Sequence, residues 1–158
     1  MGYSITKVEE EFFKRTFKLA ERYREFDYDV TFLINCLYGI IIVAQSNFYS
    51  SLAFKFSKNI KGVNYKKNGE EIELRNVKLK YLLTTFRNSL AHFGDTREGE
   101  NYGRDNIQFE STLLNEIGKI KFKNKSKKAE IEFNSSESLF LFIKELKDIF
   151  EDKGILGR

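Results

Sequence analysis

The chain has 158 residues, of which 41% are hydrophobic and 32% are charged. That length suits one domain with a substantial core and is too short for two, so we expect a single domain over residues 1–158. The formal net charge of +4 permits a polyanionic partner without requiring one. One histidine and one cysteine exclude a zinc site built by this protein alone, and we expect neither a metal nor another cofactor.

Cysteine content and apolar runs indicate the compartment. Cys36 has no partner for an internal disulfide, which favours a reducing cytoplasm. The N-terminus lacks a hydrophobic signal core and an Arg-rich transit pattern, so we expect the mature chain to start here. The apolar run 30–44 has fifteen residues, short of the roughly 20 that a membrane span needs. We therefore expect a cytoplasmic protein without a membrane partner.

Helical periodicity marks the first part of the chain. Residues 4–26 carry apolar side chains at three- and four-residue spacing, and Thr6 with Glu9 can form a capping box. Asp29 is a good N-cap for a buried helix over 30–44, which can continue through 45–57. The apolar surface of this second helix exceeds what one bundle core would use, so we expect part of it to face a partner.

A hairpin and a third helix follow. Residues 63–67 and 70–74 flank Asn68-Gly69, a strong short-range hairpin signal. Asn76 can cap the next helix, whose apolar stripe runs to residue 93. The stripe consists of Leu79, Leu82, Leu83, Phe86, Leu90 and Phe93.

Strand-like alternation returns at 107–110 and 117–133. A turn over 124–128 would place apolar residues of the two flanking strands on one face and opposite charges on the other. The predicted pairs are Phe122 with Ile131, Ile120 with Phe133, Lys123 with Glu130, and Lys121 with Glu132. Cross-strand pairing then neutralises two of the six lysines between 119 and 128.

The last helix is predicted to begin at a capping box of Asn134 and Glu137 and to end near Lys153. These elements predict a mainly α fold: an up-and-down helical bundle with a small antiparallel β-hairpin or meander inserted before the last helix. The expected helical core covers about 4–94 and 135–153, and the loop and β excursion covers about 95–134.

The most informative stretch is 86–93, which holds the only histidine, His92, five positions after Arg87. Imidazole can exchange protons near neutral pH, and guanidinium stays charged and fits two phosphate oxygens. Both suit phosphodiester chemistry, and Asn88 could hold the imidazole tautomer or contact a ribose. The alternative is that His92 caps a helix end or is a satisfied polar group of the core.

Helix geometry limits what one copy of this stretch can do. On a helix, Arg87 and His92 lie about 140° apart and about 7.5 Å along the axis, whereas Asn88 and His92 share a face. One helix cannot easily close both groups on one phosphate. A helix end at Gly94, or a second copy across a dimer axis, would bring them together.

The string Arg-Asn-Ser-Leu-Ala-His over 87–92 resembles the signature of the HEPN superfamily, an Arg, four to six residues and a His, with a polar residue after the Arg. The run 29–39 is similar to the opening helix of stand-alone HEPN nuclease-like families. The resemblance implies a dimerising helical bundle. In active members it implies a metal-independent endoribonuclease whose site is shared by two protomers, here with Arg87, Asn88 and His92.

Further residues are candidates for substrate binding. The polar loop 94–104 after His92 offers Arg97, Tyr102 and Arg104 for phosphate and base contacts, with a solvated loop as the alternative. The basic turn offers Lys125, Lys127 and Lys128 for RNA. Asn35 could line the site, although a satisfied buried amide is the favoured interpretation.

These observations favour a homodimeric endoribonuclease that cuts RNA through the 2′-hydroxyl, and a toxin or phage-defence effector with an antitoxin or regulatory partner protein would fit the resemblance. The alternatives are a non-catalytic RNA-binding or regulatory module and a helical dimerisation adaptor.

Overall fold

The structure is a computed structural model that describes residues 6–47, 52–56, 58–91, 106–111, 117–124 and 128–156. It contains four α-helices, two short 3₁₀ helices and five strands in the described part. The helices are α1 (Lys7–Ala20), η1 (Tyr23–Glu25), α2 (Asp29–Asn47), η3 (Leu74–Asn76), α3 (Leu79–Ala91) and α4 (Ser136–Asp152). The strands are β1 (Val63–Lys67), β2 (Glu70–Ile72), β3 (Asn106–Ser111), β4 (Ile117–Asn124) and β5 (Ala129–Phe133).

All five strands join one antiparallel sheet in the order β2-β1-β5-β4-β3. The prediction of a mainly α bundle with a small β insertion is therefore correct for the four helices and wrong for the extent of the sheet. The early hairpin does not stand apart, because β1 pairs with β5 along its whole length, with Val63 opposite Phe133 and Tyr65 opposite Ile131. This pairing buries the apolar side of β1 against the same core.

Both predicted hairpins are present. Asn68 and Gly69 have φ values of 54° and 79°, the left-handed pair that a two-residue type I′ turn requires. The register of β4 and β5 matches the predicted pairs, including Phe122 opposite Ile131 and Lys123 opposite Glu130. Ile120, Phe122, Ile131 and Phe133 are buried, which confirms that one face of this hairpin belongs to the core.

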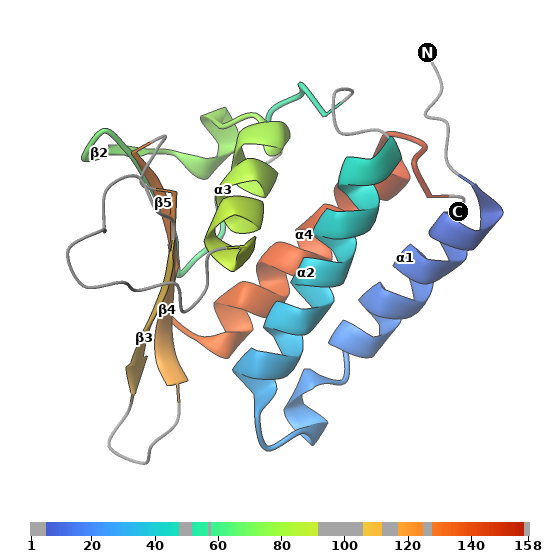
Figure 1. Ribbon diagram of the computed structural model, residues 1–158, viewed down its shortest axis with the longest axis horizontal. Coiled ribbons are helices and arrows are strands. Elements are labelled where there is room, and N and C mark those ends of the chain that lie inside the picture. The colour runs from blue at the N-terminus through green and yellow to red at the C-terminus, as the bar shows by residue number, and fades with distance from the viewer. Residues whose placement is uncertain are drawn as a thin grey trace.

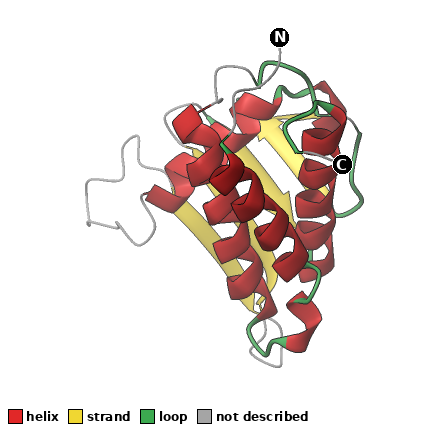
Figure 2. Cartoon of the chain, turned by 90° about the vertical axis from the view of Figure 1, so that its right-hand side faces the viewer, coloured by secondary structure: helices red, strands yellow, loops and turns green. Residues whose placement is uncertain are grey.

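The helices cover one face of the sheet (Figure 1; Figure 2). Helix α3 contacts β3, β4 and β5, and α4 contacts β1 and β5. Helix α2 packs on both α3 and α4, and α1 packs on α2 and α4. The outward face of the sheet carries the polar members of the alternating strands, such as Asn64, Lys66, Lys121 and Glu132.

A cluster of phenylalanine rings fixes α3 on the sheet. Phe86 of α3 lies 4.9 Å from Phe122 of β4, 6.0 Å from Phe133 of β5 and 5.3 Å from Phe142 of α4, measured between ring centroids. All four side chains are fully buried. Edge-to-face contacts between aromatic rings contribute beyond the area they bury. The residue directly before Arg87 is thus the one that anchors the helix.

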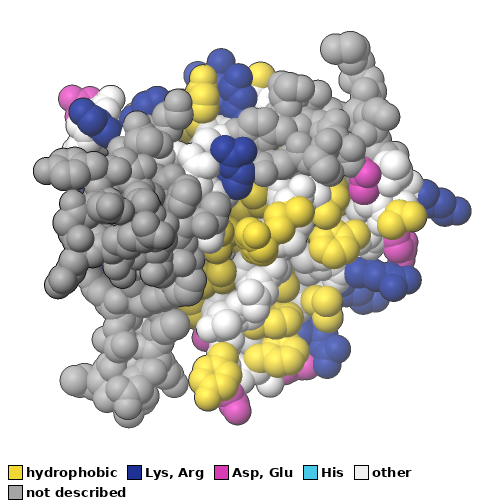
Figure 3. Space-filling view, viewed as in Figure 1, with side chains coloured by type: hydrophobic (Ala, Val, Ile, Leu, Met, Phe, Trp, Pro, Cys, Tyr) yellow, Lys and Arg dark blue, Asp and Glu magenta, His cyan; other side chains and the backbone are white. Residues whose placement is uncertain are grey.

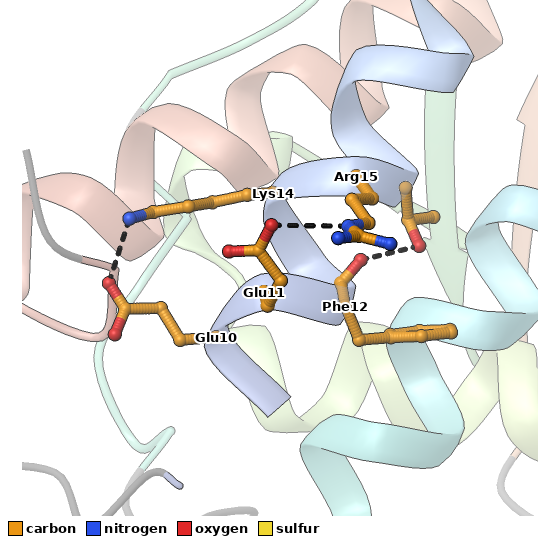
Figure 4. Close-up of polar contacts among 6 residues, drawn as sticks. Glu10, Glu11, Phe12, Lys14 and Arg15 are labelled. Carbon is orange, nitrogen blue, oxygen red and sulfur yellow. Dashed lines mark hydrogen bonds and ion pairs between the residues drawn. The ribbon is translucent and has the colours of Figure 1, made fainter. Parts of the chain in front are cut away.

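Helix α1 is amphipathic, as predicted, and it starts at the predicted Thr6 and Glu9 capping box. Its outer side carries ion pairs between Lys14 and Glu10 at 3.0 Å and between Arg15 and Glu11 at 3.1 Å (Figure 4). The carbonyl of Phe12 accepts a hydrogen bond from the Thr16 hydroxyl at 2.8 Å. Exposed i,i+4 pairs of this kind contribute only a few tenths of a kcal/mol, about 0.3–0.5 each, so burial of the inner face holds α1 in place.

Three local predictions were wrong. Residues 52–56 do not continue α2. They run beside the start of α3, where the Phe56 N–H donates to the Val77 carbonyl at 2.8 Å. Asn76 ends η3 instead of capping α3. The capping box of α4 is formed by Ser135 and Ser138, one position later than predicted.

Among the helices in the described ranges, none combines the length and the hydropathy that crossing a membrane requires.

Candidate functional site

Helix α3 places Arg87 and Asn88 at the boundary between core and solvent. The positions before them, Leu82, Leu83 and Phe86, are fully buried, whereas Arg87 is exposed and Asn88 is half-buried. This arrangement follows from the apolar periodicity of the helix. Ala91 is the last described residue of α3, and His92, the next residue along the chain, lies outside the described residues.

Arg87 and Asn88 form one unit. Nε and Nη2 of Arg87 donate to Oδ1 of Asn88 at 3.1 and 3.0 Å. The guanidinium is therefore held along the helix surface by its neighbour, which reduces the rotamer freedom that a long cationic side chain would lose on binding an anion. The polar residue after the arginine has a role that its position in the sequence did not reveal, namely orientation of the cation.

Ser89 anchors α3 to the sheet next to the Arg87–Asn88 pair. Its side chain is completely buried, and its hydroxyl lies 2.6 Å from the Thr85 carbonyl and 2.9 Å from the Lys123 carbonyl of β4. The single hydroxyl proton is shared between an acceptor of the same helix and an acceptor of the sheet. This contact fixes the rotation of α3 about its axis at the position next to Asn88. Sequence reasoning missed it, although a serine among the buried positions of an amphipathic helix was a usable signal.

Ser89→Ala should lower the free energy of unfolding by about 1–2 kcal/mol, because a buried carbonyl loses a donor and water cannot replace it. The matched control is Thr84→Ala in the same helix, whose hydroxyl donates only to the Lys80 carbonyl at 2.7 Å. That half-buried local bond should contribute less than about 0.5 kcal/mol. Urea unfolding followed by circular dichroism measures both, and equal losses would show that Ser89 has no special anchoring role.

The remaining predicted site residues fall into two groups. Arg97, Tyr102, Arg104, Lys125 and Lys127 lie outside the described residues. Lys128 is exposed in the turn between β4 and β5, with a φ of 52°. The favoured interpretation of Asn35 as a buried amide is wrong, because its side chain is exposed on α2. It shares a stripe with Thr31 and Tyr38, which are also exposed and lie four and three residues away.

Cys36, one residue further along α2, is not a candidate nucleophile. Burial raises the pKa of its thiol to about 11, so it is protonated near neutral pH. Among the described residues, no group of three or more His, Cys, Asp or Glu side chains is arranged to hold a metal ion.

In a comparison with protein-family models, residues 1–155 match the family described as HEPN pEK499 p136. The chain belongs to the HEPN superfamily. Curated proteins and solved structures gave no match. Because the family model spans nearly the whole chain, the sheet is as much a part of this HEPN protein as the helices are. Family membership indicates a nuclease-like or RNA-related role and supports the resemblance carried by residues 87–92.

Proposed function

We propose that this HEPN protein is a metal-independent endoribonuclease whose site is built from Arg87, Asn88 and His92. The observation that carries the proposal is the exposed Arg87–Asn88 pair on a buried, well-anchored helix whose last described residue directly precedes the single histidine in the sequence. A rigid helix presenting a pre-oriented cation is the arrangement that transition-state stabilisation requires. Membership of the family makes RNA the natural substrate.

In this proposal each residue has a distinct task. His92 removes the proton of the RNA 2′-hydroxyl, which then attacks the adjacent phosphorus atom. Arg87 binds the non-bridging oxygens as negative charge develops on them. Asn88 holds the guanidinium in place through its Oδ1. A second His92 from a partner copy donates the proton that the 5′ leaving oxygen needs.

The need for a second copy comes from the helix geometry and from the surface of α2. On a helix that continued to position 92, Arg87 and His92 would point about 140° apart, so one copy of the motif would be incomplete. Hydrophobic side chains gather over α2 and α1 (Figure 3), and Phe12, Tyr38 and Ile42 are 41%, 42% and 47% exposed. Such a contiguous apolar face is typical of an interface. A homodimer through this face is therefore part of the proposal.

Ile42→Lys should convert the dimer to a monomer, because a lysine in the middle of an apolar interface leaves a charge without solvent or a partner. Leu141→Lys is the matched control, since Leu141 is 37% exposed on α4 instead of α2. Light scattering at micromolar concentration should give a dimer mass for the wild type and the control and a monomer mass for Ile42→Lys. A monomeric wild type would contradict the shared site.

The proposed activity is tested by incubating purified protein with total RNA, with His92→Ala as the matched inactive chain. Cleavage by the wild type alone means an enzyme. If the protein retains RNA tightly without cleaving it, the alternative holds and it is an RNA-binding or regulatory module. If it neither cleaves nor retains RNA, it is a dimerisation adaptor. Toxicity on expression in bacteria that Arg87→Ala relieves would indicate a toxin or phage-defence effector, with an antitoxin as the expected partner.

A further inference from the structure

The two hairpin turns at one end of the sheet form a second basic region that the Arg87 site does not use. The Asn68 N–H donates to the Lys128 carbonyl at 2.8 Å, which joins the turn between β1 and β2 to the turn between β4 and β5. A pocket of about 300 Å³ opens there. Its polar lining consists of Lys66, Lys123, Lys128, Asn124 and Glu130.

The charges in this pocket are poorly compensated within the protein. In the described part of the chain, none of the ion pairs involves Lys66, Lys123 or Lys128. Glu130 lies between Lys66 and Lys123 in the strand register, and among the described residues that line the pocket it is the acidic one. Three ammonium groups around one carboxylate repel one another unless an anion joins them, and a phosphate group is the anion that suits several lysines at once.

An exposed aromatic ring lies at the same end of the sheet. Tyr81, in the first turns of α3, is 46% exposed, and the ammonium of Lys67 lies 5.4 Å from its ring centroid. Lys67 directly follows Lys66 in β1, so their side chains leave opposite faces of the sheet. The ring therefore lies on the helix-covered side of this turn, and the lysines of the pocket lie on its outward side. An exposed ring beside cations is the combination with which proteins hold single-stranded nucleic acid, because bases stack on the ring while phosphates contact the lysines.

Helix α3 connects this region to the candidate site. Tyr81 and Asn88 are seven residues apart, which places them within about 20° of each other around the helix and about 10 Å apart along it. The hairpin end of the sheet lies along this side, since Lys67 contacts Tyr81 near one end and the Ser89 hydroxyl reaches the Lys123 carbonyl near the other. An RNA strand that passes from the outward face around the end of the two turns meets Tyr81 and can then follow α3 toward Asn88 and Arg87.

We infer that Lys66, Lys123, Lys128 and Tyr81 form a binding platform for single-stranded RNA, in which the lysines hold phosphate groups and Tyr81 stacks a base. The inference rests on the proposed ribonuclease function, because it makes this platform the place where substrate is held outside the reacting bond. Glu130 weakens the attraction and so keeps the platform from retaining product. The ligand is thus a polyanion with exposed bases.

Binding is measured by the fluorescence anisotropy of a labelled RNA oligonucleotide whose 2′-hydroxyls are all replaced by 2′-O-methyl groups, so that the full-length chain with its His92 cannot cut it. Combining Lys66→Gln, Lys123→Gln and Lys128→Gln should raise the Kd at least about tenfold. It should also make the slope of log Kd against log salt shallower by about 2, because each of the three lost phosphate contacts contributes roughly 0.7 to that slope. The control combines Lys18→Gln, Lys61→Gln and Lys144→Gln, which are exposed elsewhere and remove the same charge. It should change the Kd less than about threefold.

Two single variants give effects that loss of folding would not produce. Glu130→Gln should lower the Kd, because it removes a carboxylate that repels the phosphate groups of the RNA from the pocket. Tyr81→Ala should raise the Kd about fivefold or more, and Tyr81→Phe should leave it unchanged because stacking needs only the ring. Inorganic phosphate at millimolar concentration should displace little RNA.

The platform is overturned if both lysine triples weaken binding equally, if Glu130→Gln fails to tighten it, or if phosphate alone displaces the RNA. These outcomes are independent of cleavage. Loss of cleavage in His92→Ala together with wild-type RNA binding by the lysine triple would leave the ribonuclease standing and remove the platform. If His92→Ala still cleaves RNA at the wild-type rate and the triple lysine variant binds RNA more weakly, the ribonuclease proposal fails and the binding platform stands.

Discussion

Replacing His92 with alanine should lower the rate of RNA cleavage by about 10²- to 10⁴-fold, the range that a positioned general acid or base contributes. In a shared site the loss falls at the upper end, because both the base and the acid come from the same substitution. The rate is measured on a labelled oligoribonucleotide in single-turnover conditions, so that binding and chemistry are separated. The anisotropy assay should show nearly unchanged RNA affinity, since the proposal assigns binding of the phosphate oxygens to Arg87 and proton transfer to His92.

Substitutions of Arg87 test whether cleavage needs only a positive charge or also the planar guanidinium. Arg87→Ala should lower the rate by about 10²- to 10³-fold, comparable to loss of one preorganised oxyanion donor. Arg87→Lys keeps the charge but loses the fork that donates to Asn88 at 3.0 and 3.1 Å, so it should recover little of the rate. Full activity in Arg87→Lys would mean that charge alone matters. Wild-type rates in His92→Ala would remove the ribonuclease proposal altogether.

The parts of this fold that could be predicted from sequence are those with local causes. The register of β4 and β5 was predictable because alternating apolar residues and opposite charges flank one short turn, so a single register satisfies both. The Asn68-Gly69 turn was predictable because few other residue pairs adopt two positive φ values. The long helices follow from three- and four-residue apolar spacing.

The union of the strands into one sheet could not be predicted, because it depends on pairing across a long stretch of sequence. β1 at 63–67 pairs with β5 at 129–133, and nothing near β1 specifies that partner. The exposure of Asn35 could not be predicted from hydropathy either. The run around it is almost uniformly apolar, so hydropathy could not tell which side of α2 faces solvent. Thr31, four residues earlier on the same exposed stripe, was the available signal.

In the candidate site, too, features with local causes were predictable and features that depend on distant residues were not. The exposed position of Arg87 follows from helical periodicity around Leu82, Leu83 and Phe86. The role of Ser89 was not predictable, since its second acceptor, the Lys123 carbonyl, is 34 residues away. Lys66 and Lys123 were also missed, because their proximity depends on the unpredicted neighbouring of β1, β5 and β4.

A substrate with a single 2′-deoxyribose at the cleavage position should resist the enzyme completely, and this is the largest effect expected here. The proposed nucleophile is the substrate's own 2′-hydroxyl, so its removal leaves His92 with no proton to take. Cleavage of the unmodified strand should survive EDTA. The reason is that attack by the 2′-hydroxyl needs a base and a cation, which the proposal takes from His92 and Arg87. The carboxylates nearest the motif in sequence, Asp95, Glu98 and Glu100, lie outside the described residues.

The chemical groups at the ends of the cleavage products also test whether the 2′-hydroxyl is the nucleophile. Attack by the 2′-hydroxyl expels the 5′ oxygen, so the upstream fragment should carry a 2′,3′-cyclic phosphate and the downstream fragment a 5′-hydroxyl, as mass spectrometry can show. The matched control is a strand with 2′-deoxyribose one position away from the cut, which keeps the nucleophile and should be cleaved normally. If EDTA abolishes cleavage, or if DNA is cut as fast as RNA, then water activated by a metal ion is the nucleophile. His92 would in that case act as a ligand or as a cap for α3 instead of a general base.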